Sequence, residues 1–142
     1  MGTKAVIGIR HVDGSIRAST AYYDGYTRHT LPILVKHYNT YKKASELIDH
    51  GDVQSVMPEI GEKHAWNDLS RPERCKFYHR DRNEDWSFVY PIVYSNLKEL
   101  MNSVFYNGYV YIFADNNWQH YVNGELLVLE PLDANNSTHL PE

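Results

Sequence analysis

A chain of 142 residues with a formal net charge of −4 is long enough to bury its own core, but it lacks the basic surplus of proteins that bind duplex nucleic acid. We therefore expect no duplex nucleic-acid partner. No apolar run approaches the length of a membrane span, so we expect no membrane partner; the single cysteine, Cys75, excludes an internal disulfide and a cysteine-based zinc site.

The N-terminal part of the chain is predicted to form a β-hairpin. Residues 4–12 and 15–23 have the composition of strands, and Asp13-Gly14 between them is a strong signal for a tight turn. Asp24-Gly25 is a second turn signal, which is predicted to end the second strand.

Two helices are predicted after this hairpin. Thr30 has a side chain suited to a helix N-cap, and Pro32 would then lie in the first turn, where its missing N–H does no harm. The second helix is predicted from about residue 40 to residue 50, with Tyr41 on its buried side and Gly51 as its stop signal.

The middle of the chain combines a long loop with a charged stretch. Residues 52–72 show no sustained periodicity and are predicted to form a surface loop. Residues 75–79 and 87–90 have the composition of short strands. The stretch between them, FYHRDRNEDW at residues 77–86, is therefore predicted to be the tip of a hairpin or the end of a strand.

The C-terminal part predicts a short helix followed by a β-meander. Ser95 is the expected helix cap, and strands are predicted at residues 109–114, 118–122 and 125–129, separated by asparagine-rich turns. Because the tyrosine-rich strands at 109–122 lie near a chain end, we expect them to offer an exposed edge, and we expect a homo-oligomer to form through that edge or through the aromatic face.

This order of elements predicts an α+β fold. We expect a single domain with a largely antiparallel sheet, about three helices on one face and the C-terminal β-meander. The domain is predicted to cover residues 1–132, and residues 133–142 are predicted to form a polar tail.

The residues that could carry catalysis do not form a recognisable catalytic motif. The eight histidines lack metal-binding spacing, so we expect no metal and no cofactor. Cys75 and His79 would point to the same face of a strand, but too far apart for proton transfer. The acidic residues Asp81, Glu84 and Asp85 stand beside arginines, which favours solvated ion pairs over acid–base chemistry. We therefore expect that the protein is not an enzyme.

Two segments, AYYDGYTRH (21–29) and FYHRDRNEDW (77–86), combine aromatic rings, arginine and a carboxylate beside a turn. Such a set suits a nucleotide-like ligand, since rings stack on a base and arginine binds phosphate, and it suits a protein hot spot equally well. An ordinary turn needs similar residues. The predicted binding residues are Tyr23, Asp24, Tyr26, Arg28, His79, Arg80, Asp81, Arg82, Glu84 and Trp86.

These segments also carry a resemblance. Together with ELIDHGDV (46–53) and the strands at 109–118, they are similar to a family of small uncharacterised proteins common in tailed-phage genomes. Family members usually read W-D-G-Y and H-R-D-R-G-E where this chain has YDGY (23–26) and HRDRNE (79–84). Asn83 replaces a glycine, and asparagine tolerates the left-handed conformation that a turn would require there.

The resemblance implies an early phage protein outside the virion, located in the cytoplasm of an infected bacterial host. It implies a non-enzymatic role in host takeover or against host defence. The expected activity is the sequestration of a nucleotide-derived immune signal, and the alternative is an inhibitor that docks directly on a host defence enzyme or complex. The sequence leaves both partners open.

Overall fold

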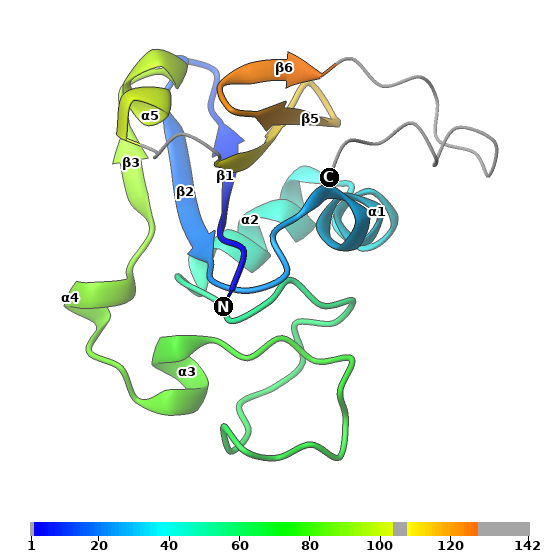
Figure 1. The fold of residues 1–142 in the computed structure, drawn as a ribbon. Helices are drawn as coiled ribbons and strands as arrows, with labels where there is room; N and C mark the ends of the chain where they lie inside the picture. Colours follow the sequence, from blue (N-terminus) through cyan, green and yellow to red (C-terminus); the bar gives the residue numbers. More distant parts are fainter. Residues whose placement is uncertain (1, 104–107, 128–142) are drawn as a thin grey trace, which may run out of the picture.

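The structure is a computed structural model that describes residues 2–103 and 108–127, and it has a six-stranded sheet at its centre (Figure 1). The strands follow the spatial order β3-β2-β1-β4-β5-β6. In chain order they are β1 (Ala5–Arg10), β2 (Ile16–Ala21), β3 (Ile92–Tyr94), β4 (Tyr109–Ala114), β5 (Asn117–Val122) and β6 (Glu125–Leu127). β1 and β4 run parallel, and the other neighbouring pairs run antiparallel. The predicted α+β class, single domain and C-terminal meander are confirmed.

The hairpin of β1 and β2 forms as predicted, because the turn residues satisfy its geometry. The Asp13 carboxylate accepts hydrogen bonds from the backbone N–H and the hydroxyl of Ser15, at 2.9 and 2.7 Å. Gly14 has a φ of 90°, a conformation that costs glycine little. The register pairs Ala5 with Ala21, so the hairpin is fixed along its whole length.

Helix α1 (Thr27–His37) begins earlier than the sequence indicates. Thr30 is buried inside the helix and donates its hydroxyl to the carbonyl of Asp24 at 2.6 Å, so the prediction that Thr30 is the N-cap is wrong. Tyr26 takes that position without a side-chain cap. Pro32 consequently lies in the helix interior, where it removes one backbone hydrogen bond.

Helix α2 (Tyr41–Asp49) has the predicted boundaries. The Thr40 hydroxyl accepts a hydrogen bond from the Lys43 N–H at 3.1 Å, and Gly51 follows the helix with a φ of 80°. Tyr41, which was expected to be buried, is 52 % exposed, because the buried stripe of the helix consists of Ala44, Leu47 and Ile48.

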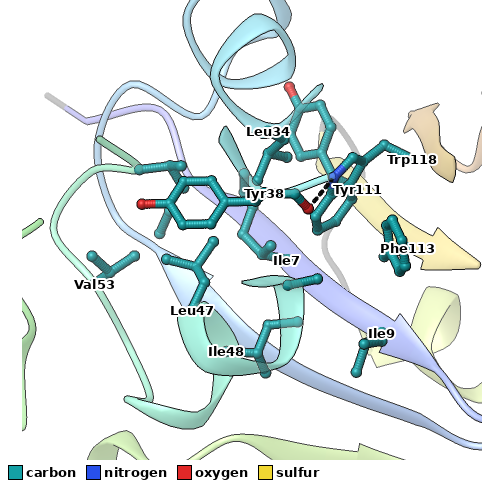
Figure 2. Packing of buried hydrophobic residues seen from close by; sticks show 14 of the residues in the cluster. Ile7, Ile9, Leu34, Tyr38, Leu47, Ile48, Val53, Tyr111, Phe113 and Trp118 are labelled. Carbon is teal, nitrogen blue, oxygen red and sulfur yellow. Dashed lines mark hydrogen bonds between the residues drawn. The ribbon is translucent and has the colours of Figure 1, made fainter. Parts of the chain in front are cut away.

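The two faces of the sheet are covered by different helices. α1 and α2 pack on one face, where Ile7, Tyr38 and Leu47 belong to the larger core (Figure 2). In this core the indole N–H of Trp118 donates to the carbonyl of Tyr38 at 3.1 Å. Helix α5 (Leu97–Ser103) packs on the opposite face through Leu100, so the helices are divided between the faces. Each fully buried aliphatic side chain stabilises the fold by about 1.5–3 kcal/mol.

The loop between α2 and the next helix, predicted to lie on the surface, is partly inserted into the core. Val53 and Val56 are buried, and Val53 forms isolated β-bridges with Ala21 and Phe77. The loop is followed by two short helices, α3 (Tyr78–Arg82) and α4 (Trp86–Val89). The strands expected at residues 75–79 and 87–90 are therefore absent from this described part of the chain, and so is the hairpin between them.

The meander of β4, β5 and β6 forms as predicted, but it does not place residues 109–122 at an edge. β4 pairs with β1 and β5, and β5 pairs with β4 and β6, so both strands are interior. Within the described residues the edge strands are β3 and β6. The prediction that the strands at 109–122 form an exposed edge is therefore wrong, whereas homo-oligomerisation itself stays a prediction. The predicted tail at 133–142 lies outside the described residues. No helix in the described part of the chain has the length and apolar character needed to cross a bilayer.

Candidate functional site

The FYHRDRNEDW stretch folds as two helical turns joined by a left-handed residue. Phe77 precedes α3 in an extended conformation, and Asn83 ends α3 with φ 62° and ψ 27°. Asparagine adopts this conformation more readily than most residues, as expected for the position where the resembling proteins have glycine. The carboxylate of Asp85 then caps α4 by accepting the Ser87 N–H at 2.9 Å.

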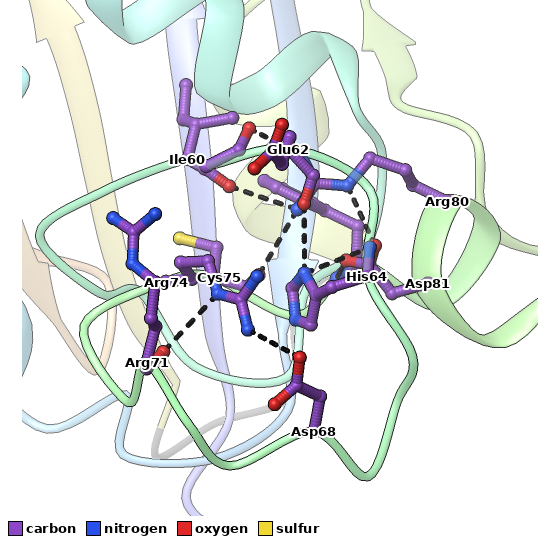
Figure 3. A network of polar contacts seen from close by, with 11 residues as sticks. Ile60, Glu62, His64, Asp68, Arg71, Arg74, Cys75, Arg80 and Asp81 are labelled. Carbon is purple, nitrogen blue, oxygen red and sulfur yellow. Dashed lines mark hydrogen bonds and ion pairs between the residues drawn. The ribbon is translucent and has the colours of Figure 1, made fainter.

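The carboxylate of Asp81 organises this region from inside the protein (Figure 3). Its side chain is fully buried, and it accepts the backbone N–H of Phe77 at 2.9 Å and of His64 at 3.1 Å. It also accepts the Nε of Arg80 at 2.9 Å. Burial alone would raise the pKa of Asp81, but these three hydrogen bonds outweigh it and hold the pKa below its ordinary value.

The guanidinium of Arg80 is directed into the loop and not toward solvent. Nη1 donates to the carbonyl of Gly61 at 2.9 Å, and Nη2 donates to the carbonyls of Ile60 at 3.0 Å and Cys75 at 3.3 Å. The guanidinium also lies 4.8 Å from the ring centroid of Phe77. We refer to these residues as the Asp81 network: Ile60, Gly61, His64, Cys75, Phe77, Arg80 and Asp81. Arg80 and Asp81, predicted to reach a ligand, have their polar groups engaged within the chain.

The other side of α3 carries aromatic rings and cations. The ring of Tyr78 lies 5.2 Å from that of Tyr22 and 5.0 Å from that of Trp66. Arg82, one turn after Tyr78, lies 5.2 Å from the centroid of Trp66 and 5.8 Å from that of Tyr78. Two lysines lie over the outer rings, Lys76 over Trp66 at 5.7 Å and Lys4 over Tyr22 at 5.2 Å. We call this group the cation–aromatic cluster: Lys4, Tyr22, Trp66, Lys76, Tyr78 and Arg82.

The two tyrosines of the cluster both have a raised pKa, so their hydroxyls are neutral at neutral pH. Burial, with the neighbouring carboxylate of Asp52, raises the pKa of Tyr22 to about 12, and its hydroxyl donates to Asp52 at 3.2 Å. Burial likewise raises the pKa of Tyr78. Burial raises the pKa of Asp52 too, although it accepts the N–H of Thr20 at 2.9 Å. The positive charge of the cluster therefore comes from its lysines and its arginine.

The first predicted segment reaches this cluster through a residue that the sequence did not single out. The ring that meets α3 is Tyr22, while the neighbouring Tyr23 is 46 % exposed. Asp24 has a φ of 57° and accepts the Ser55 hydroxyl at 2.9 Å, which is a structural role in the turn. Tyr26 contacts His29 at the start of α1.

The remaining predicted residues lie on other surfaces. Arg28 is an exposed residue of α1, and Glu84 is exposed after α3. Five members of the cluster are absent from the predicted binding residues: Lys4, Tyr22, Trp66, Lys76 and Tyr78. Tyr22 and Tyr78 lie inside the two predicted segments, and Trp66 gave a signal as a large aromatic residue within a polar loop.

A hollow of about 390 Å³ lies on the opposite side of α3 from Tyr78 and Arg82. It is lined by Asp49, His50, His79, Arg80 and Trp86. Burial, assisted by the charge of Arg80, lowers the pKa of His50, so its ring is neutral here. The Nδ1–H of His79 donates to the carbonyl of Glu84 at 2.8 Å, and its ring meets the half-exposed ring of Trp86 at 5.0 Å. Arg80, the arginine that lines this hollow, is already bonded to Asp81 and to backbone carbonyls, so the hollow offers little positive charge to an anionic ligand.

The described residues provide neither an activated thiol nor a metal-binding group. Cys75 is fully buried, and burial raises the pKa of its thiol to about 11, so the thiolate is not populated at neutral pH. Its sulfur contacts the backbone of Met57 and the hydroxyl of Tyr38. No set of three histidine, cysteine or acidic side chains in the described part of the chain could hold a metal ion.

No family model, curated protein or solved structure matches this chain. The expected resemblance to tailed-phage proteins therefore stays a prediction from the sequence motifs, among them those at residues 23–26 and 79–84. What the structure adds is the role of these motifs: Asp24 and Asn83 occupy left-handed turn positions, and Asp81 holds the loop.

Proposed function

We propose that this protein binds a nucleotide-like anion on the cation–aromatic cluster without turning it over, and thereby acts in host takeover or against the defences of a bacterial host. The observation that supports the proposal is the geometry of the cluster. Rings from three separate segments form a row in which the centroid of Tyr78 lies 5.2 Å from that of Tyr22 and 5.0 Å from that of Trp66. Three cations, Lys4, Lys76 and Arg82, lie over rings of this row. Rings that stack and cations that attract phosphate are the recognised means of binding nucleotides without a deep pocket.

Arg82 is the residue that suits phosphate best. A guanidinium that lies over aromatic rings keeps its N–H groups directed along its own plane, where a phosphate can accept two of them. Lys76 lies on the same ring as Arg82, so two cations flank Trp66. The loss of a stacked base contact typically costs about 1–3 kcal/mol of binding free energy.

A second candidate function is the inhibition of a host defence protein by direct docking. Tyrosine, tryptophan and arginine are the residues that dominate protein–protein hot spots, and all three occur in the cluster. On this alternative, Trp66 and Arg82 would contact a protein surface in place of a base and a phosphate.

Calorimetric titration with AMP, a cyclic dinucleotide, ADP-ribose and inorganic phosphate tests the first candidate. We expect binding of at least one nucleotide, weakened about tenfold or more by Trp66→Ala and by Arg82→Ala, which corresponds to roughly 1.4 kcal/mol each. Arg28→Ala, which removes an exposed arginine of α1, is the matched control and should bind as the wild type does. Absence of nucleotide binding by the folded wild type would contradict the proposal.

Affinity purification from expressing bacterial cells separates the two candidates. Mass spectrometry of co-purified proteins and of extracted metabolites should find a retained nucleotide and no stoichiometric protein partner. A stable protein partner that is lost in Arg82→Ala, with no retained nucleotide, would favour the docking alternative.

Turnover is tested with the same nucleotides by chromatography of the reaction products. We expect none, since the thiol of Cys75 is protonated and the carboxylate of Asp81 is fully hydrogen-bonded. Product formation that disappears in His79→Ala would show that the protein is an enzyme.

A further inference from the structure

A second surface of the molecule is apolar and has no relation to the cation–aromatic cluster. Five large side chains between residues 86 and 93 are exposed, from 40 % for Trp86 to 81 % for Phe88. We call them the apolar strip: Trp86, Phe88, Tyr90, Ile92 and Val93. Scattered exposed apolar residues are ordinary, but five of them within eight consecutive residues are a candidate interaction surface.

The backbone of the strip is held in place. Val89, the last residue of α4, is buried, and its carbonyl accepts the N–H of Asp52 at 2.9 Å. The N–H of Tyr90 donates to the carbonyl of Trp86 at 3.0 Å, and Asp85 caps the helix. The apolar side chains are therefore presented on an ordered segment, which lowers the entropy cost of binding.

The strip ends at β3, an edge of the sheet formed by residues 2–103 and 108–127. β3 pairs with β2 on one side, and it is the last strand of the sheet on the side away from β6 (Figure 1). Ile92 is 49 % and Val93 is 63 % exposed, and neither is a charged residue of the kind that protects natural edges. A second strand can add to such an edge through main-chain hydrogen bonds, with apolar side chains on both faces.

The charge distribution favours a second copy of this chain as the occupant. No charged residue occurs from Trp86 to Leu97, although the chain as a whole has a formal charge of −4. Arg17, which lies opposite Val93 on the neighbouring strand β2, is cationic. Its Nη2 forms an ion pair with the Oδ1 of Asp49 at 2.9 Å, so its charge is neutralised. Two copies can therefore meet along this strip without placing like charges opposite each other.

The area of the strip also suits a dimer. Aromatic side chains contribute about 150–250 Å² each when fully exposed, so the strip presents on the order of 500 Å² of apolar surface. Two copies would together bury about 1,000 Å², the lower bound for a specific interface. An antiparallel strand pair is self-complementary about a two-fold axis, which is the commonest symmetry of homo-oligomers.

We propose that the apolar strip is a self-association surface, and that two copies pair β3 against β3 about a two-fold axis, with Trp86, Phe88 and Tyr90 packed at either end. The two sheets become continuous across this axis. The dimer leaves the cation–aromatic cluster outside the interface, so it does not depend on the proposed ligand.

Sedimentation of the wild type and of edge variants tests this proposal. We expect the wild type to approach the dimer mass as its concentration rises through the micromolar range. Ile92→Lys should raise the dimer Kd about tenfold or more, because the two-fold axis brings two like charges together. Phe88→Ser, at a residue with little contact in the monomer, should also weaken the dimer. Leu126→Lys is the matched control, since Leu126 is likewise 49 % exposed but lies on the other edge strand, β6; its Kd should not change.

Amide hydrogen exchange supplies a second readout for the same samples. The amides of residues 92–94 should exchange more slowly as the dimer forms, whereas those of β6 should not. A wild type that stays monomeric at high micromolar concentration overturns the proposal. So does a dimer that Leu126→Lys weakens and that folded Ile92→Lys and Phe88→Ser leave intact.

Discussion

The two sides of helix α3 differ in how they use the same kinds of residue. On the inner side, Arg80 and Asp81 satisfy backbone groups of the 60–64 loop, and both side chains are largely buried. On the outer side, Arg82 lies against rings at the surface. Two arginines that are two residues apart thus have different surroundings: one is bonded into the fold, and the other lies on the surface that we propose as a ligand site. Residue type alone does not distinguish them; the direction of the side chain from the helix does.

Among the substitutions that test this difference between the two sides of α3, removal of the Asp81 carboxylate should have the largest effect on stability. Asp81→Ala leaves the guanidinium of Arg80 without its ionic partner and two buried N–H groups without an acceptor. We expect a loss of about 3–5 kcal/mol in the free energy of unfolding, as for other broken buried pairs. Urea denaturation measures it. Glu84→Ala removes an exposed carboxylate nearby and should change stability by less than about 0.5 kcal/mol. Equal effects of the two substitutions would remove the distinction between the sides.

His120, a buried side chain with one nitrogen unpaired within the described part of the chain, contrasts with the fully hydrogen-bonded Asp81. His120 is 1 % exposed; its Nε2 lies 2.8 Å from the hydroxyl of Thr27, and among the described residues its Nδ1 has no hydrogen-bond partner. Burial lowers the pKa of His120 to about 4, from 6.5. The imidazole of His120 binds a proton more readily in the unfolded chain than in the folded one. Its contribution to the free energy of unfolding is therefore complete above pH 6.5 and is lost as the pH falls toward 4, by about 3 kcal/mol in total.

Denaturant unfolding at a series of pH values tests this expectation. His120→Gln should flatten the slope of stability against pH between 6.5 and 4. Leu34→Ala, which destabilises the same core without removing a titrating group, is the control and should keep the wild-type slope. An unchanged slope in His120→Gln would mean that another group causes the acid sensitivity. Asp81, with its lowered pKa, should contribute only at lower pH, where its carboxylate becomes protonated.

The smallest changes in stability are expected for the two arginines of α3, and they test directly whether Arg80 and Arg82 differ. Arg80→Ala leaves the carbonyls of Ile60, Gly61 and Cys75 without their donor, and we expect a cost of about 1–3 kcal/mol. Arg82→Ala removes only contacts with rings, so its cost should be about 0.5–1 kcal/mol. Thermal melting and ligand binding should be measured on both. If Arg82→Ala melts lower than Arg80→Ala, the assignment of the inner and outer sides is reversed.

The sequence predicted the parts of the fold that depend on local chemistry. Asp13-Gly14, the Thr40 cap and the asparagine turns of the meander act within a few residues, so their patterns were sufficient. The parallel pairing of β1 with β4 was not visible, because it joins segments from opposite ends of the chain. Tyr41 was misplaced because Ala44, a smaller residue, provides the contact with the sheet.

The candidate site was predicted only in part, for a related reason. The two segments that contain Tyr22 and Tyr78 were recognised as unusual. The helical conformation of the second, however, depends on Asp81 binding the N–H of His64, which a local pattern cannot show. Alternation of apolar and polar residues at 75–79 favoured a strand instead. Trp66 and Lys76 join the site through the fold of the loop, so no spacing in the sequence links them to Tyr22.

The parallel pairing of β1 with β4 has a consequence for how the chain acquires its structure. Ala5 lies opposite Tyr109, so the centre of the sheet closes only when segments separated by about a hundred residues meet, a high contact order. The β1–β2 hairpin can form while synthesis continues, but it leaves one edge of β1 open until β4 has emerged from the ribosome. Until then, Ile7 and Ile9 lack the strand that covers their flank, and the nascent chain is exposed to pairing with other strands.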